Sequence, residues 1–254
     1  MIFSSGTKKP KIHSSAYVAP TAVVSGDVTI EAGCAILHGA VVTAEGAPIA
    51  IGAECVIMEQ AVVKSSGGSA LNFPVRIGER CIVGPHAYVV GASISAGCFI
   101  ASGARIFNGA RIGERSSVAL GATVHISTVV APGTRVPMQH IAYGDPARIV
   151  SPEHAAEVHE ALNFFETVFN LEAGEDVRAQ AATAYARFLR KAHAQDAPVG
   201  DGTHTTKSSP RRSAGDEPPK AQIAEVDGVV DAMMLELQEM EHRRAESLKK
   251  KPSR

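Results

Sequence analysis

Aliphatic side chains recur at intervals of six residues through most of the first 150 positions of the chain. The longest uninterrupted series consists of Ile94, Ile100, Ile106, Ile112, Val118, Val124, Val130 and Val136. An α-helix of 3.6 residues per turn cannot keep a six-residue period on one face, whereas short strands joined by tight turns can. The pattern therefore predicts an all-β solenoid over residues 10–150, with three repeats to a coil and about six to seven coils in all.

A small side chain follows most of these aliphatic residues four positions later, as at Ala16, Ala22 and Ala40. All four cysteines occupy this position: Cys34, Cys55, Cys81 and Cys98. A narrow triangular coil needs a bulky residue on each side and a small one where the backbone turns a corner. Because the cysteine spacing follows the repeat, we expect buried apolar thiols rather than metal ligands, nucleophiles or disulfides.

The repeat is interrupted in three places. Three extra residues lie between Val42 and Ile51, residues 64–74 (KSSGGSALNFP) form a longer insertion, and one residue is missing between Val89 and Ile94. A regular solenoid offers little room for chemistry, so these interruptions are where function is sought. The Gly/Ser-rich insertion is equally compatible with an inert spacer.

Helices are predicted after the repeat, over residues 151–194. Ser151 provides an N-cap with Pro152 at the first helical position. One apolar face follows, made of Ala155, Val158, Leu162, Phe165 and Phe169. We expect this helix to pack along the solenoid, and a second helix to run from about Glu175 to His193.

The remaining residues are predicted to form a linker and a terminal helix. Residues 195–220 are rich in Pro, Gly, Ser, Thr and charge, which is typical of a disordered linker. Residues 221–250 show a heptad-like stripe made of Ile223, Val226, Val230, Met233, Leu237 and Met240. This amphipathic helix either binds a protein partner or further copies of the chain, or docks back on the solenoid.

Composition narrows the partners and the compartment. The 254 residues carry a formal net charge of −1, without the basic excess that nucleic-acid binding needs. No apolar run is long enough to cross a membrane, and the N-terminal residues lack a signal-peptide core. We therefore expect a cytoplasmic protein that binds neither nucleic acid nor membrane.

The six-residue period with its small fourth position resembles the left-handed parallel β-helix of the hexapeptide-repeat superfamily. Members of that superfamily usually form trimers, and their active sites lie in clefts between subunits. The resemblance covers roughly residues 10–150. It implies a fold more narrowly than a function, because the superfamily contains acyltransferases, γ-class carbonic anhydrases and scaffolding subunits.

Residues 24–63 resemble the γ-class carbonic anhydrase branch, which carries an Arg-Gly-Asp motif, a Gln-Asp-Asn motif and three zinc-binding histidines. The corresponding residues here are Thr43-Ala44-Glu45, Met58-Glu59-Gln60, and Lys64, Pro85 and Val90. Zinc-dependent hydration requires neutral imidazole ligands and an open position for water. We therefore expect no zinc. Small pointed-end dynactin subunits, which this stretch also resembles, lack the same histidines and serve as assembly and adaptor surfaces.

Counting three repeats per coil places Thr43, Lys64, Val90, Phe107 and His125 in one column. His125 lies two coils beyond Val90, about 10 Å away, and cannot replace a missing ligand. His86 is the imidazole nearest the former zinc position. Together with Lys64 and Glu59 it forms a candidate site for an anion or a general base, the alternative being a solvated or interface histidine.

Three functions are compatible with these features. The first is a homotrimeric assembly or scaffold protein without the zinc triad. The second is an acyltransferase that binds coenzyme A and uses His86 or His125 as its base. The third is a γ-class carbonic anhydrase with a displaced metal site.

Overall fold

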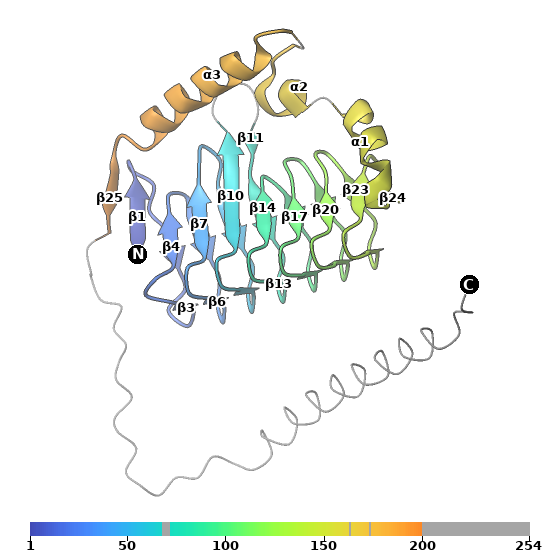
Figure 1. The fold of residues 1–254 in the computed structure, drawn as a ribbon. Coiled ribbons are helices and arrows are strands. Elements are labelled where there is room, and N and C mark those ends of the chain that lie inside the picture. Colours follow the sequence, from blue (N-terminus) through green and yellow to red (C-terminus); the bar gives the residue numbers. More distant parts are fainter. Residues whose placement is uncertain (68–71, 163, 173, 200–254) are drawn as a thin grey trace, which may run out of the picture. The chain divides into compact units, whose positions relative to one another are not determined.

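The computed structural model describes residues 1–67, 72–162, 164–172 and 174–199. Within them, short parallel strands stack into three sheets around one core, and the coils wind in the left-handed sense (Figure 1). The β-helix predicted from the six-residue period is confirmed. We number the sheets 1 to 3.

Sheet 1 holds the parallel strands β1 (Ile2–Ser5), β4 (Val23–Ser25), β7 (Val41–Ala44), β10 (Val62–Gly67), β14 (Tyr88–Val90), β17 (Arg105–Ile106), β20 (Thr123–Val124) and β23 (Ile141–Tyr143). Sheet 2 holds β2 (Lys11–Ile12), β5 (Val28–Ile30), β8 (Ile49–Ile51), β12 (Val75–Ile77), β15 (Ser93–Ile94), β18 (Arg111–Ile112) and β21 (Val129–Val130). Sheet 3 holds β3 (Tyr17–Val18), β6 (Ala35–Ile36), β9 (Val56–Ile57), β13 (Ile82–Val83), β16 (Phe99–Ile100), β19 (Ser117–Val118) and β22 (Arg135–Val136).

The seven strands in each of sheets 2 and 3 give seven complete coils, at the upper end of the predicted number. Strand β1 adds a further rung to sheet 1, because Ile2 pairs in register with Val24 of β4. This rung lies before residue 10 and was not predicted, since no repeat precedes it in the sequence.

The aliphatic series fills the interior, as the period requires. Ile36, Ile57 and Ile100 of sheet 3 are fully buried, each beside an outward-facing neighbour. The cysteines are buried and free, as predicted. Each thiol donates a hydrogen bond to a carbonyl of the following coil, for example Cys34 Sγ to Gly52 O at 3.0 Å.

The predicted single helix after the repeat is instead broken into shorter pieces. These are a 3₁₀ turn (Pro152–His154), α1 (Ala155–Ala161) and α2 (Phe164–Phe169). Leu162 ends α1 in an extended conformation (φ −133°, ψ 119°). The break redirects the chain, so that the rings of Phe164 and Phe169 contact each other and line a pocket over sheet 1. Ser151 stands at the predicted N-cap before Pro152, but its hydroxyl donates to the Glu153 carboxylate and makes no capping bond to a helix N–H.

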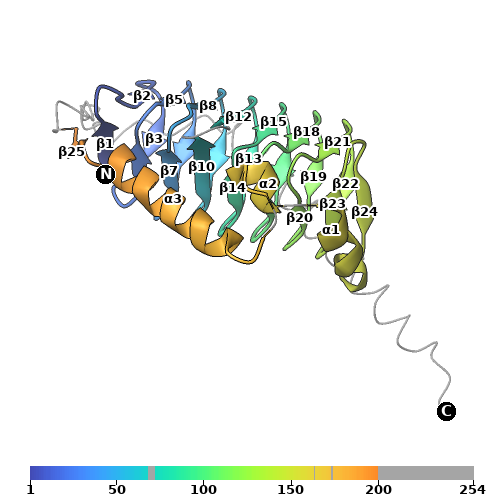
Figure 2. The same cartoon turned by 90° about the horizontal axis from the view of Figure 1, so that it is seen from above.

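Helix α3 (Val177–Ala192), close to the second predicted helix, returns over sheet 1 toward the N-terminal end (Figure 2). It leads into β25 (Asp196–Pro198), which pairs antiparallel with β1. These three residues correct the prediction that a disordered linker begins at residue 195, because main-chain hydrogen bonds place them on the open edge of sheet 1. The predicted linker from residue 200 onward and the helix predicted at 221–250 lie outside the described residues.

Two further antiparallel strands extend sheet 1. Strand β24 (Arg148–Val150) pairs with β23, and β11 (Asn72–Phe73) pairs with β10. The insertion at 64–74 therefore continues β10 into a hairpin whose ends the structure describes, and it brings Ser66 opposite Phe73.

The outer surfaces of the three sheets differ in chemistry. Helices α2 and α3 cover part of sheet 1, and sheet 2 points mostly polar residues outward, including Lys11, Arg76 and Arg111. Sheet 3 exposes large apolar side chains: Tyr17, Ile82 and Phe99 are 51%, 39% and 48% exposed. We call this surface the apolar face. Separately, no helix among the described residues is long and apolar enough to cross a membrane.

Candidate functional site

The column predicted on sheet 1 is confirmed by the strand register. Lys64 of β10 pairs with Thr43 of β7 on one side and with Val90 of β14 on the other. The rings of Phe107 and His125 continue the column, with centroids 5.8 Å apart. By the resemblance described above, Lys64 corresponds to a zinc-binding histidine of that family.

Lys64 is engaged in a buried ion pair. Its Nζ lies 2.8 Å from Oε2 of Glu45, a residue of the first insertion, and also donates to the hydroxyl of Tyr185 on α3 at 2.8 Å. The Tyr185 hydroxyl in turn donates to Glu45 Oε2 at 3.2 Å. The Lys64 and Glu45 side chains are only 19% and 9% exposed. These three residues form a polar cluster beneath α3, and the imidazole of His193 lies 3.8 Å from Glu45 Oε1 at its rim.

Main-chain contacts hold Glu45 in place. Ser65, next to Lys64 on β10, accepts a hydrogen bond from the Glu45 N–H at 3.0 Å and donates to Ala47 O at 2.5 Å. Ser65 is fully buried. The strand that carries the cation therefore also fixes the loop that carries its partner.

The charge states of the cluster follow from its surroundings. Burial lowers the pKa of Lys64, but its hydrogen bonds with Glu45 and Tyr185 and the negative charge of Glu45 together outweigh burial, so the net effect raises the pKa. Burial is the largest cause that raises the pKa of Tyr185. Lys64 is therefore protonated and Tyr185 neutral near pH 7, and the charges of Lys64 and Glu45 cancel.

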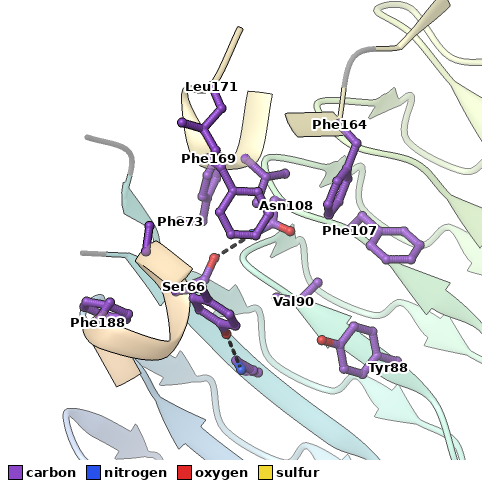
Figure 3. A pocket seen from close by; sticks show the side chains of 14 residues that line it. Ser66, Phe73, Tyr88, Val90, Phe107, Asn108, Phe164, Phe169, Leu171 and Phe188 are labelled. Carbon is purple, nitrogen blue, oxygen red and sulfur yellow. Dashed lines mark hydrogen bonds between the residues drawn. The ribbon is translucent and has the colours of Figure 1, made fainter. Parts of the chain in front are cut away.

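An aromatic pocket lies beside the cluster, between sheet 1 and helices α2 and α3 (Figure 3). Its volume is about 260 Å³. Half of its fourteen lining residues are aromatic: Phe73, Tyr88, Phe107, Phe164, Phe169, Tyr185 and Phe188. At one side the amide nitrogen of buried Asn108 donates to Ser66 Oγ at 2.6 Å.

Lys64 does not meet the other two candidate residues, His86 and Glu59. Both lie exposed at the corner between sheets 3 and 1, where the His86 N–H donates to Glu59 O at 3.1 Å. His86 aligns with Gln60, and Lys64 is four residues further along β10. At about 3.3 Å per residue, that places Lys64 about 13 Å from the corner.

Sequence reasoning missed two residues of the cluster. Glu45 had a signal, because it stands in an interruption of the repeat and at the acidic position of the family motif. Tyr185 had none, because it lies 121 residues beyond Lys64 and only the return of α3 brings it there.

The residues at the family's metal position do not fit a zinc ion. Lys64 is protonated and paired, while the side chains of Pro85 and Val90 have no lone pair to donate. Within the described part of the chain, no group of three His, Cys, Asp or Glu side chains lies close enough to hold a metal. We derive no metal-dependent step at this site.

His125, the second imidazole proposed as a base, is hydrogen-bonded to its own backbone. The Ile126 N–H donates to Nδ1 at 2.8 Å, which leaves the proton of the neutral ring on Nε2. Burial is the main cause that lowers the pKa of His125, and the charge of His159 adds to it. Neither ring nitrogen therefore presents a free lone pair to a substrate.

Comparison with known proteins places this site in context. No family model matches the chain. It is 28% identical to γ carbonic anhydrase 1, mitochondrial, of Arabidopsis thaliana over 192 residues, covering 74% of the chain and 68% of the relative. It is 25% identical to γ carbonic anhydrase 2, mitochondrial, of the same plant over 193 residues, covering 74% and 67%.

Comparison with solved structures also finds two transferases. A hexapeptide transferase family protein from Anaplasma phagocytophilum shares 17% identity and a TM-score of 0.30, over 76% of this chain and 96% of that one. The UDP-N-acetylglucosamine acyltransferase of Francisella novicida shares 13% identity and a TM-score of 0.41, over 72% and 83%. With the sequence relatives and the β-helix, the resemblance to the γ-class carbonic anhydrase branch of the hexapeptide-repeat proteins is confirmed.

Proposed function

We propose that this chain is a γ-carbonic anhydrase-like protein that acts by assembly, as a homotrimeric scaffold, and does not hydrate CO2. The observation that carries this proposal is the Lys64–Glu45 ion pair. By the sequence resemblance, Lys64 corresponds to a zinc-binding histidine of that family, and here its Nζ lies 2.8 Å from Glu45. A protonated ammonium at that position repels a divalent cation, and Glu45 is already neutralised.

Covering of the cluster by α3 also argues against hydration chemistry. Tyr185 bonds to both charged groups, so opening the site to water would break two hydrogen bonds. Restoring a zinc centre would further require donor atoms in place of Pro85 and Val90. Both the charge and the shape of the site therefore oppose a zinc-bound hydroxide.

The apolar face is our candidate for the assembly surface. Its exposed Tyr17, Ile82 and Phe99 follow one line of outward positions along sheet 3, and Leu120 and Met138 extend it at one edge. Apolar side chains aligned in this way are typical of protein interfaces. We propose that further copies of this chain cover it, as the trimers of the hexapeptide-repeat superfamily suggest.

This assignment gives a different role to the predicted corner residues. Glu59 and His86 lie at the corner that adjoins the apolar face. We propose that they border the interface between subunits and do not act as a catalytic pair. The helix predicted at 221–250 remains a second proposed contact with a partner.

Solution mass tests the assembly proposal. Light scattering coupled to size-exclusion chromatography should give a trimer mass that does not change over a hundredfold range of concentration. Phe99→Glu should dissociate it, because a buried carboxylate would face an apolar partner surface. Ala50→Glu is the matched control on the exposed surface of sheet 2 and should leave the trimer intact. A monomeric wild type, or a trimer indifferent to Phe99→Glu, would contradict the proposal.

The acyltransferase alternative has a simple test of its own. Coenzyme A that binds the native state raises the melting temperature in proportion to its affinity. We expect no shift at millimolar coenzyme A. A saturable rise that His86→Ala abolishes would instead favour an acyltransferase with its base at the corner.

A further inference from the structure

We propose that the aromatic pocket beneath α2 and α3 binds a small uncharged aromatic molecule. This site goes beyond the proposed assembly function and does not depend on it, because the pocket lies on sheet 1 and the apolar face on sheet 3. Nothing in the scaffold role uses a pocket of about 260 Å³. Engineered cavities of roughly 150 Å³ with apolar walls already take up benzene, so one or two rings fit here.

The floor of the pocket is built by the β-helix. Val90 of β14, Tyr88 two residues before it and Phe107 of the next coil supply the surface. Tyr88 and Phe107 meet edge to face, with ring centroids 6.2 Å apart. Two adjacent rungs of a regular sheet hold these side chains, so the floor is rigid.

The roof comes from the helical segment. Phe164 and Phe169 of α2 meet edge to face at 6.0 Å, and Phe169 meets Tyr185 of α3 at 5.8 Å. Figure 3 shows Phe164 and Phe169 facing the space above Val90. Aromatic pairs prefer edge-to-face or offset-stacked geometry. The rings of the floor and the roof present both edges and faces, so an aromatic guest between them can adopt that geometry.

One wall of the pocket stands at the coil that is one residue short, and a glycine at position 91 allows that wall to form. Gly91 adopts a positive φ of 56°, and a Cβ there would lie 2.5 Å from Phe73 Cβ and 2.9 Å from Asn108 Nδ2. The shortened coil thus lets the hairpin residue Phe73 approach the sheet and form one wall. Two interruptions of the sequence pattern meet at this wall.

The charged side chains at the pocket disfavour binding of an ionic guest. Lys64 is the one charged residue in the pocket lining, and Glu45 neutralises it at 2.8 Å. A carboxylate or phosphate guest would have to compete with Glu45, and an organic cation would meet an ammonium. The pocket therefore favours an uncharged guest over either kind of ion.

Two neutral polar groups can orient the guest. The amide nitrogen of Asn108 is used by Ser66, which leaves its carbonyl oxygen as an acceptor on the pocket side. Figure 3 shows the Tyr88 hydroxyl turned toward the same space. A ring with one O–H or N–H donor, as in a phenol or an indole, has the matching chemistry.

Fluorescence of the neutral two-ring probe 1-aminonaphthalene tests the proposal on the full chain. Wild type should enhance the emission saturably, with one probe per chain. Val90→Phe fills the floor and should weaken binding at least tenfold. Val129→Phe, the same substitution at an outward position of sheet 2, should change it less than twofold. Absence of a saturable site, or equal effects of both variants, would overturn the proposal.

Competition identifies the chemical class and does not rely on any variant folding. Phenol and indole should displace the probe from wild type, whereas benzoate and benzylamine should do so at least tenfold less well. Displacement by benzoate as effective as by phenol would refute the charge argument. The scaffold proposal would be unaffected, because oligomer mass is measured separately.

Discussion

Replacing Lys64 by Met is the most informative change to the polar cluster. Methionine keeps most of the volume and length of the side chain but removes the charge. Glu45 then stays beneath α3 with a side chain that is only 9% exposed, with the Tyr185 hydroxyl as a donor at 3.2 Å and the His193 imidazole 3.8 Å from its other oxygen. The prediction concerns the free energy of unfolding of the whole chain.

The magnitude follows from the burial of the two charges. Removing one partner of a fully buried ion pair costs about 3–5 kcal/mol, because the other charge is left uncompensated. Lys64 is 19% exposed and Tyr185 still bonds to the carboxylate, so we expect about 2–3 kcal/mol here. Adding Glu45→Gln removes the stranded charge, and the double variant should recover to within about 1 kcal/mol of wild type.

Urea unfolding at pH 7 and one fixed protein concentration measures these differences. Lys8→Met is the matched control, since Lys8 pairs with Asp27 at the same 2.8 Å but the two side chains are 63% and 41% exposed. It should cost about 1 kcal/mol or less. Equal costs for the two lysine substitutions would refute the reasoning, as would a double variant that loses the sum of its two single changes.

Three further predictions concern the backbone, the pH dependence and the thiols. Gly91→Ala should destabilise the chain by about 2 kcal/mol or more in urea unfolding, because of its positive φ and the contacts with Phe73 and Asn108; no loss would contradict the wall geometry. The folded pKa of His125 lies below its ordinary value of 6.5, so the unfolded chain binds the proton first and stability falls as the pH drops below about 6.5. His125→Phe should show a smaller loss between pH 7.5 and 5.5, and an unchanged loss would exclude His125 as its source. The four buried thiols should react with a thiol reagent only at the rate of unfolding, and rapid labelling of the native chain would contradict their burial.

The fold was predictable because its signal is local and repeated. In each two-residue strand one side chain points into the core. Because successive strands lie six residues apart, an aliphatic residue recurs in the sequence at that interval. Strand β1 escaped detection because a single rung has no period. The helix break at Leu162 was not predicted for a different reason. The spacing of apolar residues is compatible with one continuous helix, but in the structure contacts among aromatic rings accompany two separate helices.

The site was only partly predictable. Lys64 was identified through the family motif, but His86 and Glu59 were grouped with it although the strand separates them. Glu59 and Lys64 are close in the sequence, but they lie toward opposite ends of β10. One end of this strand lies at the corner between sheets 3 and 1, and the other lies beneath α3. Tyr185 and Phe188 could be assigned to the site only from the structure. No pattern in the sequence near Lys64 indicates which helix returns over that residue.

Zinc content measured together with CO2 hydration tests the central claim most directly. The full chain is incubated with excess zinc, freed of unbound metal by gel filtration, and assayed for both quantities in the same sample. The ion pair of Lys64 and Glu45 predicts much less than one zinc per chain and hydration at the uncatalysed rate. One zinc per chain with hydration above that rate would show that this β-helix holds a working metal centre and would contradict the account.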